Sequence, residues 1–404
     1  MTGSAQAAGG TGSGDPYVRA RVRLEWRGTK LDLLAPHSGF SSSSIDPGTR
    51  LLIDHLPGGE PGAFLDIGCG YGAPGLAIAA RFPRSSGLLI DRDLLAVEFA
   101  RRNAVAERLE NVTVGPSLGL EAVPRGAAFD WILANLPARA GPEAVRHLVA
   151  EGRARLAPGG ELFAVIIAPL AGSLDAAAVD PPSPRRVAAS DRHIVVAFQR
   201  SEPAAAGSPR GDKPYDRDEI DFSAEGLSAP LRLVRPTDLA DEPDRLPRAV
   251  PLLARALPAP ASFPPKPRIL VFRSGYGLVT ALALARFSDA TITALDRDLL
   301  ATAFTRRNCA FAEDRLRVLE AVRPSAARPG APYDLILGEL LPPLGPAATL
   351  EELRETRELL APGGIGLIIG LSKQWREFLR DAAESLGLEV AGSSPPAALY
   401  RMLR

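Results

Sequence analysis

The sequence has few of the residues that hold metal ions or form disulfides. It contains 2 cysteines and 4 histidines among 404 residues. Cys69 and Cys309 are far apart and the histidines are scattered, so we expect no metal site. So few cysteines also suit a reducing compartment, and we predict a cytoplasmic protein. Cys69 lies in a glycine-rich loop and is expected to be a small filler rather than a nucleophile.

Long apolar runs and an excess of one charge are also absent. No segment approaches the length that crosses a bilayer, and the N-terminus lacks the basic and then apolar leader of a signal peptide. We therefore expect no membrane association. The 47 basic and 47 acidic residues give a formal net charge of +0. This balance weakens a nucleic-acid interpretation without excluding a local basic patch.

What the sequence does contain is a repeat that spans most of its length. The hexapeptide DRDLLA at residues 91–96 recurs unchanged at residues 296–301. A chain of 404 residues, 46% of them apolar, can form two domains with substantial cores. We therefore predict a tandem duplication of one whole domain. Other repeated pieces are GYG at 70–72 and 275–277, RRN at 101–103 and 306–308, and LAPGG at 156–160 and 360–364.

Composition outside the repeats sets the predicted domain boundaries. Residues 1–14 are Gly, Ser, Ala and Thr in the main, which predicts a disordered tail. Residues 202–213 are rich in Pro, Gly, Ala and Ser, which is typical of a linker. The two predicted domains are therefore residues 15–201 and residues 214–404.

Each copy has the pattern of a doubly wound α/β domain. Strands that alternate with helices predict a mostly parallel sheet with right-handed crossovers. A terminal hairpin at residues 185–200 would complete a sheet of seven strands, and residues 17–34 would form an N-terminal β-hairpin extension. In the first copy the other strands are expected at residues 64–67, 88–90, 111–114, 129–134 and 161–167.

The N-terminal hairpin is expected to have one apolar and one basic face. Apolar residues alternate with Arg19, Arg21 and Arg23, which places the three arginines together. They could contact phosphates, or they could form a solvated outer face.

A glycine-rich loop follows the first parallel strand of the first copy. Gly68, Gly70 and Gly72 come directly after residues 64–67, so a ligand can lie against bare backbone. The next strand ends on Asp91, and an acid about 20 residues past such a turn holds ribose hydroxyls. The stretch predicts a nucleoside-binding site; a glycine turn that binds no ligand is the alternative.

Two cofactors fit this site. Gly68, Gly70 and Ala73 satisfy the dinucleotide fingerprint, which alone is a weak signal. Asp66, two residues before the first glycine, makes the loop resemble the first motif of class I S-adenosylmethionine (SAM) methyltransferases. A carboxylate there favours a cationic ammonium and sulfonium, so we expect SAM rather than NAD. The predicted cofactor-binding residues are Asp66, Gly68, Cys69, Gly70, Gly72, Asp91, Arg92 and Ser117.

The second copy differs where the ligand would bind. Asp66 corresponds to Val271, and Gly68 corresponds to Arg273. Arg273 is expected to repel and sterically exclude a cationic ligand. Glu339 ends the fourth parallel strand, where the first copy has an asparagine. We therefore expect a degenerate, non-catalytic second domain.

The first copy resembles the RsmC/RlmG type of ribosomal RNA guanine exocyclic-amine methyltransferases. The resemblance implies tandem Rossmann-like class I methyltransferase domains, one active and one degenerate, with SAM as cofactor and ribosomal RNA as partner. In the best-known arrangement the active copy comes last, whereas here the better-preserved copy comes first. The segments that carry the resemblance are residues 40–41, 46–49, 66–75, 91, 129–130, 135–141 and 158–160.

The family's fourth-strand motif implies the catalytic residues Asn135, Leu136 and Pro137. The Asn135 side-chain oxygen and the Leu136 carbonyl would accept hydrogen bonds from the target amine, so that catalysis is mostly positioning. Leu136 replaces the first proline of the family motif, and Ala138 replaces a bulky residue. Relatives commonly place an Asp after the third strand for the adenine amine, where this chain has Leu118 beside Ser117.

Three functions remain open from the sequence. The first is an RNA base methyltransferase whose N-terminal copy is active and whose C-terminal copy is a platform. The second is a catalytically dead binding or scaffold protein descended from such enzymes. The third is a SAM methyltransferase that acts on a small molecule. We expect a monomer or weak oligomer.

Overall fold

The structure of the chain is a computed structural model. It describes residues 14–37, 44–137, 139, 141–172, 183–200, 213–239, 246–340 and 344–404. The predicted tail and linker lie almost wholly outside the described residues, as do residues 40–41 and Ala138.

The first domain contains a seven-stranded sheet in the order β5-β4-β3-β6-β7-β9-β8. The five strands from β5 to β7 run parallel to one another, while β9 is antiparallel to β7 and to the edge strand β8. The strands are β3 (Ala63–Ile67), β4 (Ser86–Asp91), β5 (Val112–Pro116), β6 (Phe129–Asn135), β7 (Leu156–Ile167), β8 (Arg185–Ala189) and β9 (His193–Gln199). The helices are α1 (Pro47–Asp54), α2 (Ala73–Arg81), α3 (Leu94–Ala106), α4 (Gly141–Ala154) and the short η1 (Ala168–Leu170).

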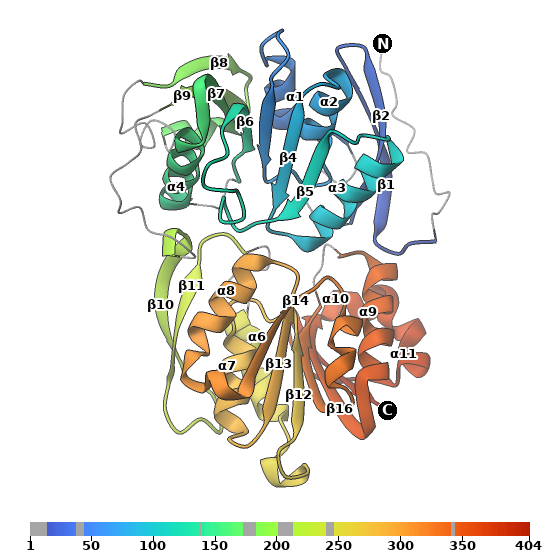
Figure 1. Ribbon diagram of the computed structural model, residues 1–404. Helices are drawn as coiled ribbons and strands as arrows, with labels where there is room; N and C mark the ends of the chain where they lie inside the picture. Colours follow the sequence, from blue (N-terminus) through green and yellow to red (C-terminus); the bar gives the residue numbers. More distant parts are fainter. Residues whose placement is uncertain are drawn as a thin grey trace.

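The second domain repeats this sheet in the order β14-β13-β12-β15-β16-β18-β17. Its strands are β12 (Arg268–Phe272), β13 (Thr291–Asp296), β14 (Leu316–Glu320), β15 (Tyr333–Glu339), β16 (Leu360–Leu371), β17 (Leu388–Ser394) and β18 (Ala397–Leu403). Its helices are α6 (Leu246–Ala256), α7 (Leu278–Arg286), α8 (Leu299–Asn308), α9 (Pro346–Leu359), α10 (Ser372–Gln374) and α11 (Arg380–Leu386), with short turns η2 (Lys213–Tyr215), η3 (Pro260–Ser262), η4 (Ala310–Arg315), η5 (Pro324–Gly330) and η7 (Trp375–Leu379). The predicted tandem doubly wound fold is confirmed (Figure 1).

Each domain also carries the predicted hairpin. The first is β1 (Val18–Trp26) with β2 (Thr29–Pro36), and the second is β10 (Asp216–Phe222) with β11 (Leu231–Pro236). In β1, Val22 and Leu24 are buried while Arg21 and Arg23 are exposed, as the alternation predicts.

The repeated RRN tripeptide attaches each hairpin to its domain. Asn103 of α3 accepts from Leu34 N and donates to the Leu34 carbonyl, at 2.8 and 2.9 Å. Asn308 of α8 makes the same pair of hydrogen bonds with Val234, both at 2.9 Å. A side-chain amide supplies one acceptor and two donors, so it can satisfy an edge strand's backbone in this way.

The carboxyl ends of the parallel strands in the two domains face each other. One apolar cluster contains buried residues of both domains, among them Leu148 and Tyr215. Corresponding residues of the repeated hexapeptides make reciprocal contacts where β4 and β13 end. These are Leu94 N–H to the Arg297 carbonyl (3.0 Å), Leu299 N–H to the Arg92 carbonyl (3.1 Å) and an antiparallel bridge between Asp93 and Asp298.

Among the described residues, no helix has both the length and the apolar character that crossing a membrane requires.

Candidate functional site

The glycine loop between β3 and α2 leaves an open stretch of backbone. Gly68 and Gly70 have φ values of 68° and 57°, in the left-handed region that glycine adopts without strain. A Cβ atom added to either would meet no atom within 4 Å. A Cβ on Gly72 would instead lie 2.8 Å from the Leu76 side chain, so this glycine allows close packing. Gly68 and Gly70 therefore form the surface on which a ligand can lie.

Asp66 places a buried carboxyl beneath this loop. Its side chain is 2% exposed, and one oxygen accepts from Gly75 N at 2.9 Å. Burial raises the pKa of Asp66 to about 7, although the hydrogen bond from Gly75 opposes the shift. A cationic ligand beside Asp66 would favour its ionised form, so the carboxyl fits a positively charged group.

Asp91 joins the glycine loop to the start of α3. One carboxylate oxygen accepts from Gly70 N at 2.9 Å, and the other accepts from Asp93 N at 2.9 Å. Burial raises the pKa of Asp91, while the Asp93 hydrogen bond lowers it. Each oxygen keeps a second lone pair, so Asp91 can still accept from ligand hydroxyls.

Asn135 ends β6 at the same edge of the sheet. Its Nδ2 donates to Asp46 Oδ2 and to Thr49 Oγ1, both at 3.0 Å. These bonds occupy the amide donors and leave Oδ1 as the acceptor for another molecule. Leu136 N donates to the Val165 carbonyl at 2.9 Å, which fixes the peptide that follows Asn135 without a proline.

Asp46 and Thr49 were not assigned a role in the site from the sequence. Both belong to the segment at residues 46–49 that carries the family resemblance, so the signal was present. Asp46 also caps α1 by accepting from Thr49 N at 2.8 Å, which places both side chains toward β6. Their link to Asn135 spans 89 and 86 residues of sequence.

Cys69 is buried between these groups. Burial and the nearby carboxylates raise the pKa of its thiol well above the ordinary value. A protonated thiol is a poor nucleophile, which agrees with the predicted role of a small filler. Within the described part of the chain, no group of three or more His, Cys, Asp or Glu side chains is arranged to hold a metal ion.

The first domain, which holds these groups, is similar to known proteins. Residues 30–173 match the family model of the methyltransferase small domain. The N-terminal domain of the chain is similar to this family. Its match covers β2 to η1 and so includes the glycine loop, Asp91 and Asn135.

Individual relatives of this methyltransferase domain agree with the family assignment. The uncharacterized protein YbxB of Bacillus subtilis is 38% identical over 128 residues, covering 31% of this chain and 64% of the relative. The ribosomal RNA small subunit methyltransferase C of Pseudomonas entomophila is 36% identical over 146 residues, covering 35% and 43%. The chain thus spans about half the length of these relatives. The predicted resemblance to the RsmC type is confirmed.

One solved structure resembles both domains together. The 16S rRNA N2 methyltransferase RsmC of T. thermophilus, in complex with AdoMet and guanosine, has a TM-score of 0.67 at 17% identity. The likeness covers 96% of this chain and 99% of that one. At this identity it shows the fold, here that of the tandem methyltransferase domains.

Arg92, which was predicted to bind the cofactor, contacts the other domain. Its guanidinium pairs with the second domain. Nη1 lies 3.1 Å from Asp238 Oδ2, and Nε lies 3.4 Å from Asp298 Oδ1. The arginine of this repeated hexapeptide therefore makes a contact between the two domains.

Ser117 and Leu118 follow β5 and shape the loop beside Asp91. Ser117 N donates to the Asp91 carbonyl at 2.9 Å, while its hydroxyl donates to the Gly119 carbonyl at 2.9 Å. Leu118 is 6% exposed and belongs to the apolar core. The hydroxyl of Ser117 thus orders the loop itself, and its backbone is the part that adjoins Asp91.

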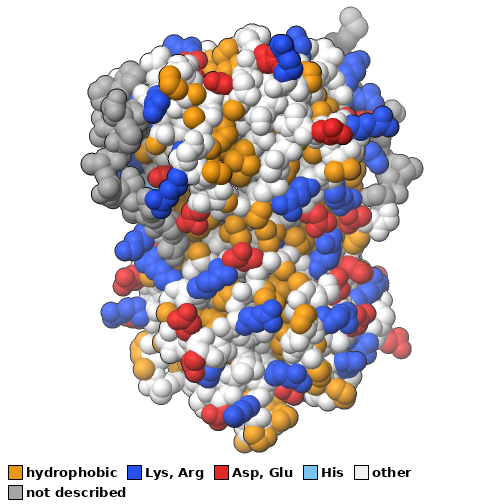
Figure 2. Space-filling view, in the orientation of Figure 1, with side chains coloured by type: hydrophobic (Ala, Val, Ile, Leu, Met, Phe, Trp, Pro, Cys, Tyr) orange, Lys and Arg blue, Asp and Glu red, His pale blue; other side chains and the backbone are white. Residues whose placement is uncertain are grey.

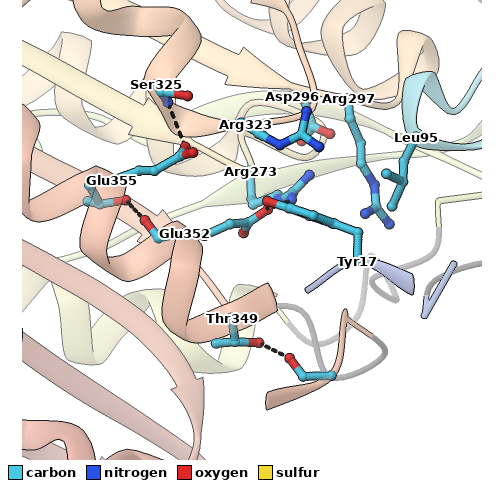
Figure 3. A network of polar contacts seen from close by, with 12 residues as sticks. Tyr17, Leu95, Arg273, Asp296, Arg297, Arg323, Ser325, Thr349, Glu352 and Glu355 are labelled. Atoms are coloured by element: carbon cyan, nitrogen blue, oxygen red, sulfur yellow. Dashed lines mark hydrogen bonds and ion pairs between the residues drawn. The ribbon is translucent and has the colours of Figure 1, made fainter. Parts of the chain in front are cut away.

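The second copy has the same backbone conformation in this loop but different polar groups. Arg273 has a φ of 57°, close to the 68° of Gly68, and Gly275 N donates to Asp296 at 3.0 Å as Gly70 does to Asp91. The Arg273 guanidinium turns to Glu352 of α9, and both side chains are 3% exposed. Figure 3 shows Tyr17 of the first domain reaching the same Glu352, to which its hydroxyl donates at 3.3 Å.

This geometry corrects the expected role of Arg273. Because Glu352 neutralises its charge, simple repulsion of a cationic ligand does not describe the second copy. A second difference is Val271, which is fully buried and apolar where the first domain has Asp66. The second copy therefore lacks the carboxylate that would attract a cation.

Proposed function

We propose that the first domain is a SAM-dependent methyltransferase that methylates an exocyclic amine of a guanine in ribosomal RNA. The second domain is a non-catalytic platform. The observation that carries the proposal is the fixed amide of Asn135, whose donors are bound by Asp46 and Thr49. Support for the substrate comes from two of the similar proteins, which are ribosomal RNA methyltransferases by name.

The glycine loop and its acids fit SAM. When bound, SAM supplies an electrophilic methyl group on a sulfonium. Gly68 and Gly70 offer bare backbone, and Asp66 offers a carboxylate near a cationic group. Asp91 accepts from the ribose hydroxyls. These roles use the polar groups that the second copy has partly lost.

Asn135 and Leu136 position the target amine. The amine donates one hydrogen bond to Asn135 Oδ1 and one to the Leu136 carbonyl. Two acceptors so placed direct the nitrogen lone pair toward the methyl group, and Pro137 restricts the backbone that follows. Fixing this geometry contributes through orientation rather than through proton abstraction, so no strong base is required.

The proposal is tested by assaying the full chain with labelled SAM and small ribosomal subunits or their deproteinised RNA. We expect one SAM site by titration calorimetry, and a methylated guanosine after nuclease digestion and mass spectrometry. The Asp66→Ala variant is the binding control. If the chain binds SAM but methylates neither substrate, the RNA assignment is wrong. If it binds no SAM, the methyltransferase assignment fails and the scaffold alternative takes its place.

A small-molecule substrate is a second candidate, favoured by the charge balance. Figure 2 shows Lys and Arg interspersed with Asp and Glu on the face drawn, in agreement with the formal net charge of +0. Phosphate contacts make RNA binding depend steeply on salt. Binding of RNA by the SAM-loaded protein that weakens as salt rises would favour the first candidate.

The raised pKa of Asp66 predicts a pH dependence of SAM binding. The free protein keeps the Asp66 carboxyl protonated below its pKa of about 7, whereas a bound cation requires the carboxylate. Affinity should therefore rise with pH, by up to about tenfold per unit below the pKa, and level off above about pH 8. Titration calorimetry between about pH 5.5 and about pH 8.5 measures this slope.

The Asp66→Asn variant is the matched control for this pH dependence. It keeps the shape of the side chain but cannot ionise, so its weaker affinity should change less with pH than that of the wild type. A wild-type affinity that stays constant over the same range would contradict the prediction.

A further inference from the structure

The second domain contacts both loops that border the proposed cofactor site. One is the loop that follows β4 and contains Asp91, and the other follows β5 and contains Ser117. Each loop is linked to the glycine loop or to the other: Asp91 binds Gly70 N, and Ser117 N binds the Asp91 carbonyl. Movement of either loop would therefore move the groups assigned to the nucleoside.

The loop after β4 is held through Arg92. Asp238 binds its guanidinium through the carboxylate at 3.1 Å and also through the backbone carbonyl. Asp298 approaches the same guanidinium at 3.4 Å. The backbone is held too, because Leu299 N donates to the Arg92 carbonyl at 3.1 Å. The residue directly after Asp91 is thus fixed by three residues of the second domain.

The loop after β5 is held by packing. Tyr215 is 4% exposed and lies in the apolar cluster that contains Leu118 and Leu148. A Cβ atom on Gly119 would be 3.5 Å from the Tyr215 hydroxyl oxygen. The tyrosine therefore covers the turn that follows Ser117.

We propose that the second domain is part of the first domain's cofactor site, with Asp238, Asp298 and Tyr215 as positioning residues. They hold the two loops in the conformation that accepts SAM, so less ordering is required on binding. The inference rests on the proposed function and goes beyond it, because it assigns the platform a direct effect on cofactor affinity. None of the three residues needs to touch SAM.

The interface also contains contacts in which residues of the first domain hold a loop of the second domain, and these supply a control. There the first domain holds the loops of the degenerate copy: Arg323 binds Glu98 at 3.1 and 3.2 Å and lies 4.7 Å over the Tyr17 ring. Weakening these contacts loosens the same pair of domains without touching the loops after β4 and β5. Asp238→Asn and Glu98→Gln therefore form a matched pair of variants, each with one carboxylate replaced by an amide.

The experiment is SAM titration calorimetry on the full chain and on the two variants at one pH. We expect about a tenfold increase in Kd for Asp238→Asn, within the usual range of coupling between sites, and an unchanged Kd for Glu98→Gln. In the methyl-transfer assay Asp238→Asn should raise the KM for SAM and leave kcat at saturating SAM unchanged. A purely structural loss would lower the active fraction, and therefore kcat, without this split.

Three outcomes would overturn the inference. Equal affinity of wild type and Asp238→Asn for SAM would overturn this inference but not the proposed function. Equal weakening of SAM binding in both variants would do the same, because the effect would then come from a general loosening of the domain interface. Absence of SAM binding by the wild type would overturn the proposed function as well.

Hydrogen exchange on the wild type gives an answer even if Asp238→Asn does not fold. Bound SAM should slow exchange of the Leu299 amide, which lies in the second domain and donates to Arg92. No change in that amide on saturation with SAM would also overturn the inference.

Discussion

Replacing Asn135 with alanine is expected to lower kcat for methyl transfer by about a hundredfold or more while SAM affinity stays unchanged. The variant removes the acceptor that would orient the target amine, and loss of one preorganised polar group typically costs this much in rate. The glycine loop, Asp66 and Asp91 are unaffected, so calorimetry should give the wild-type Kd. Full activity of the variant would show that the amide has no role in the reaction.

Variants of Thr49 test the orientation of the amide. Thr49→Val keeps the shape but loses the hydroxyl that accepts from Asn135 Nδ2, so the amide is held by Asp46 alone. We expect kcat to fall by about fivefold, the effect of one hydrogen bond of about 1 kcal/mol. Thr49→Ser keeps the hydroxyl and should recover most of the activity. Equal activity of the two variants would mean that the hydroxyl does not orient Asn135.

Replacing Glu352 with leucine is expected to destabilise the second domain by about 3–5 kcal/mol, the usual cost of leaving one member of a buried ion pair alone. Arg273 would keep its charge with its side chain 3% exposed, and Tyr17 would lose the acceptor of its hydroxyl. Scanning calorimetry of the full chain should show a lower unfolding temperature. Tyr17→Phe removes only the single hydrogen bond and should cost about 1 kcal/mol.

Comparison with the first domain indicates a second substitution that should offset the loss of stability in Glu352→Leu. Counted from Asn135 and Glu339, the position of Glu352 corresponds to Leu148, and that of Arg273 corresponds to Gly68. The double variant Arg273→Gly with Glu352→Leu therefore reproduces the first copy. It removes both charges and relieves the positive φ of Arg273, so stability should return to near the wild-type value or exceed it. A double variant as unstable as Glu352→Leu would exclude the ion pair as the cause.

Much of the fold was predictable because the same pattern of strands and helices occurs twice in the sequence. The repeats at 91–96 and 296–301 predicted the duplication, and the alternation of apolar strands with helices predicted the doubly wound sheet. The glycine loop was predictable for a local reason, since a strand, glycines and a helix follow one another in the chain. Asp91 followed from the same local pattern.

The parts that could not be predicted depend on contacts between distant segments. Asp46 meets Asn135 across 89 residues, and Arg273 meets Glu352 across 79. Arg92 was visible as a repeated residue, but its reason for being repeated is a contact with the other copy. No local pattern distinguishes an arginine that binds a ligand from one that binds a neighbouring domain.

The reciprocal contacts of the two hexapeptides have a consequence for how the chain arose. Arg92 lies 3.4 Å from Asp298, and Arg297 lies 3.3 Å from Asp93, so each copy presents the same patch to the other. A self-complementary patch of this kind is the mark of a symmetric homodimer. In a single-domain ancestor that paired in this way, every substitution would appear in both halves. In one chain the two halves are independent, so that one can carry Arg273 where the other has Gly68.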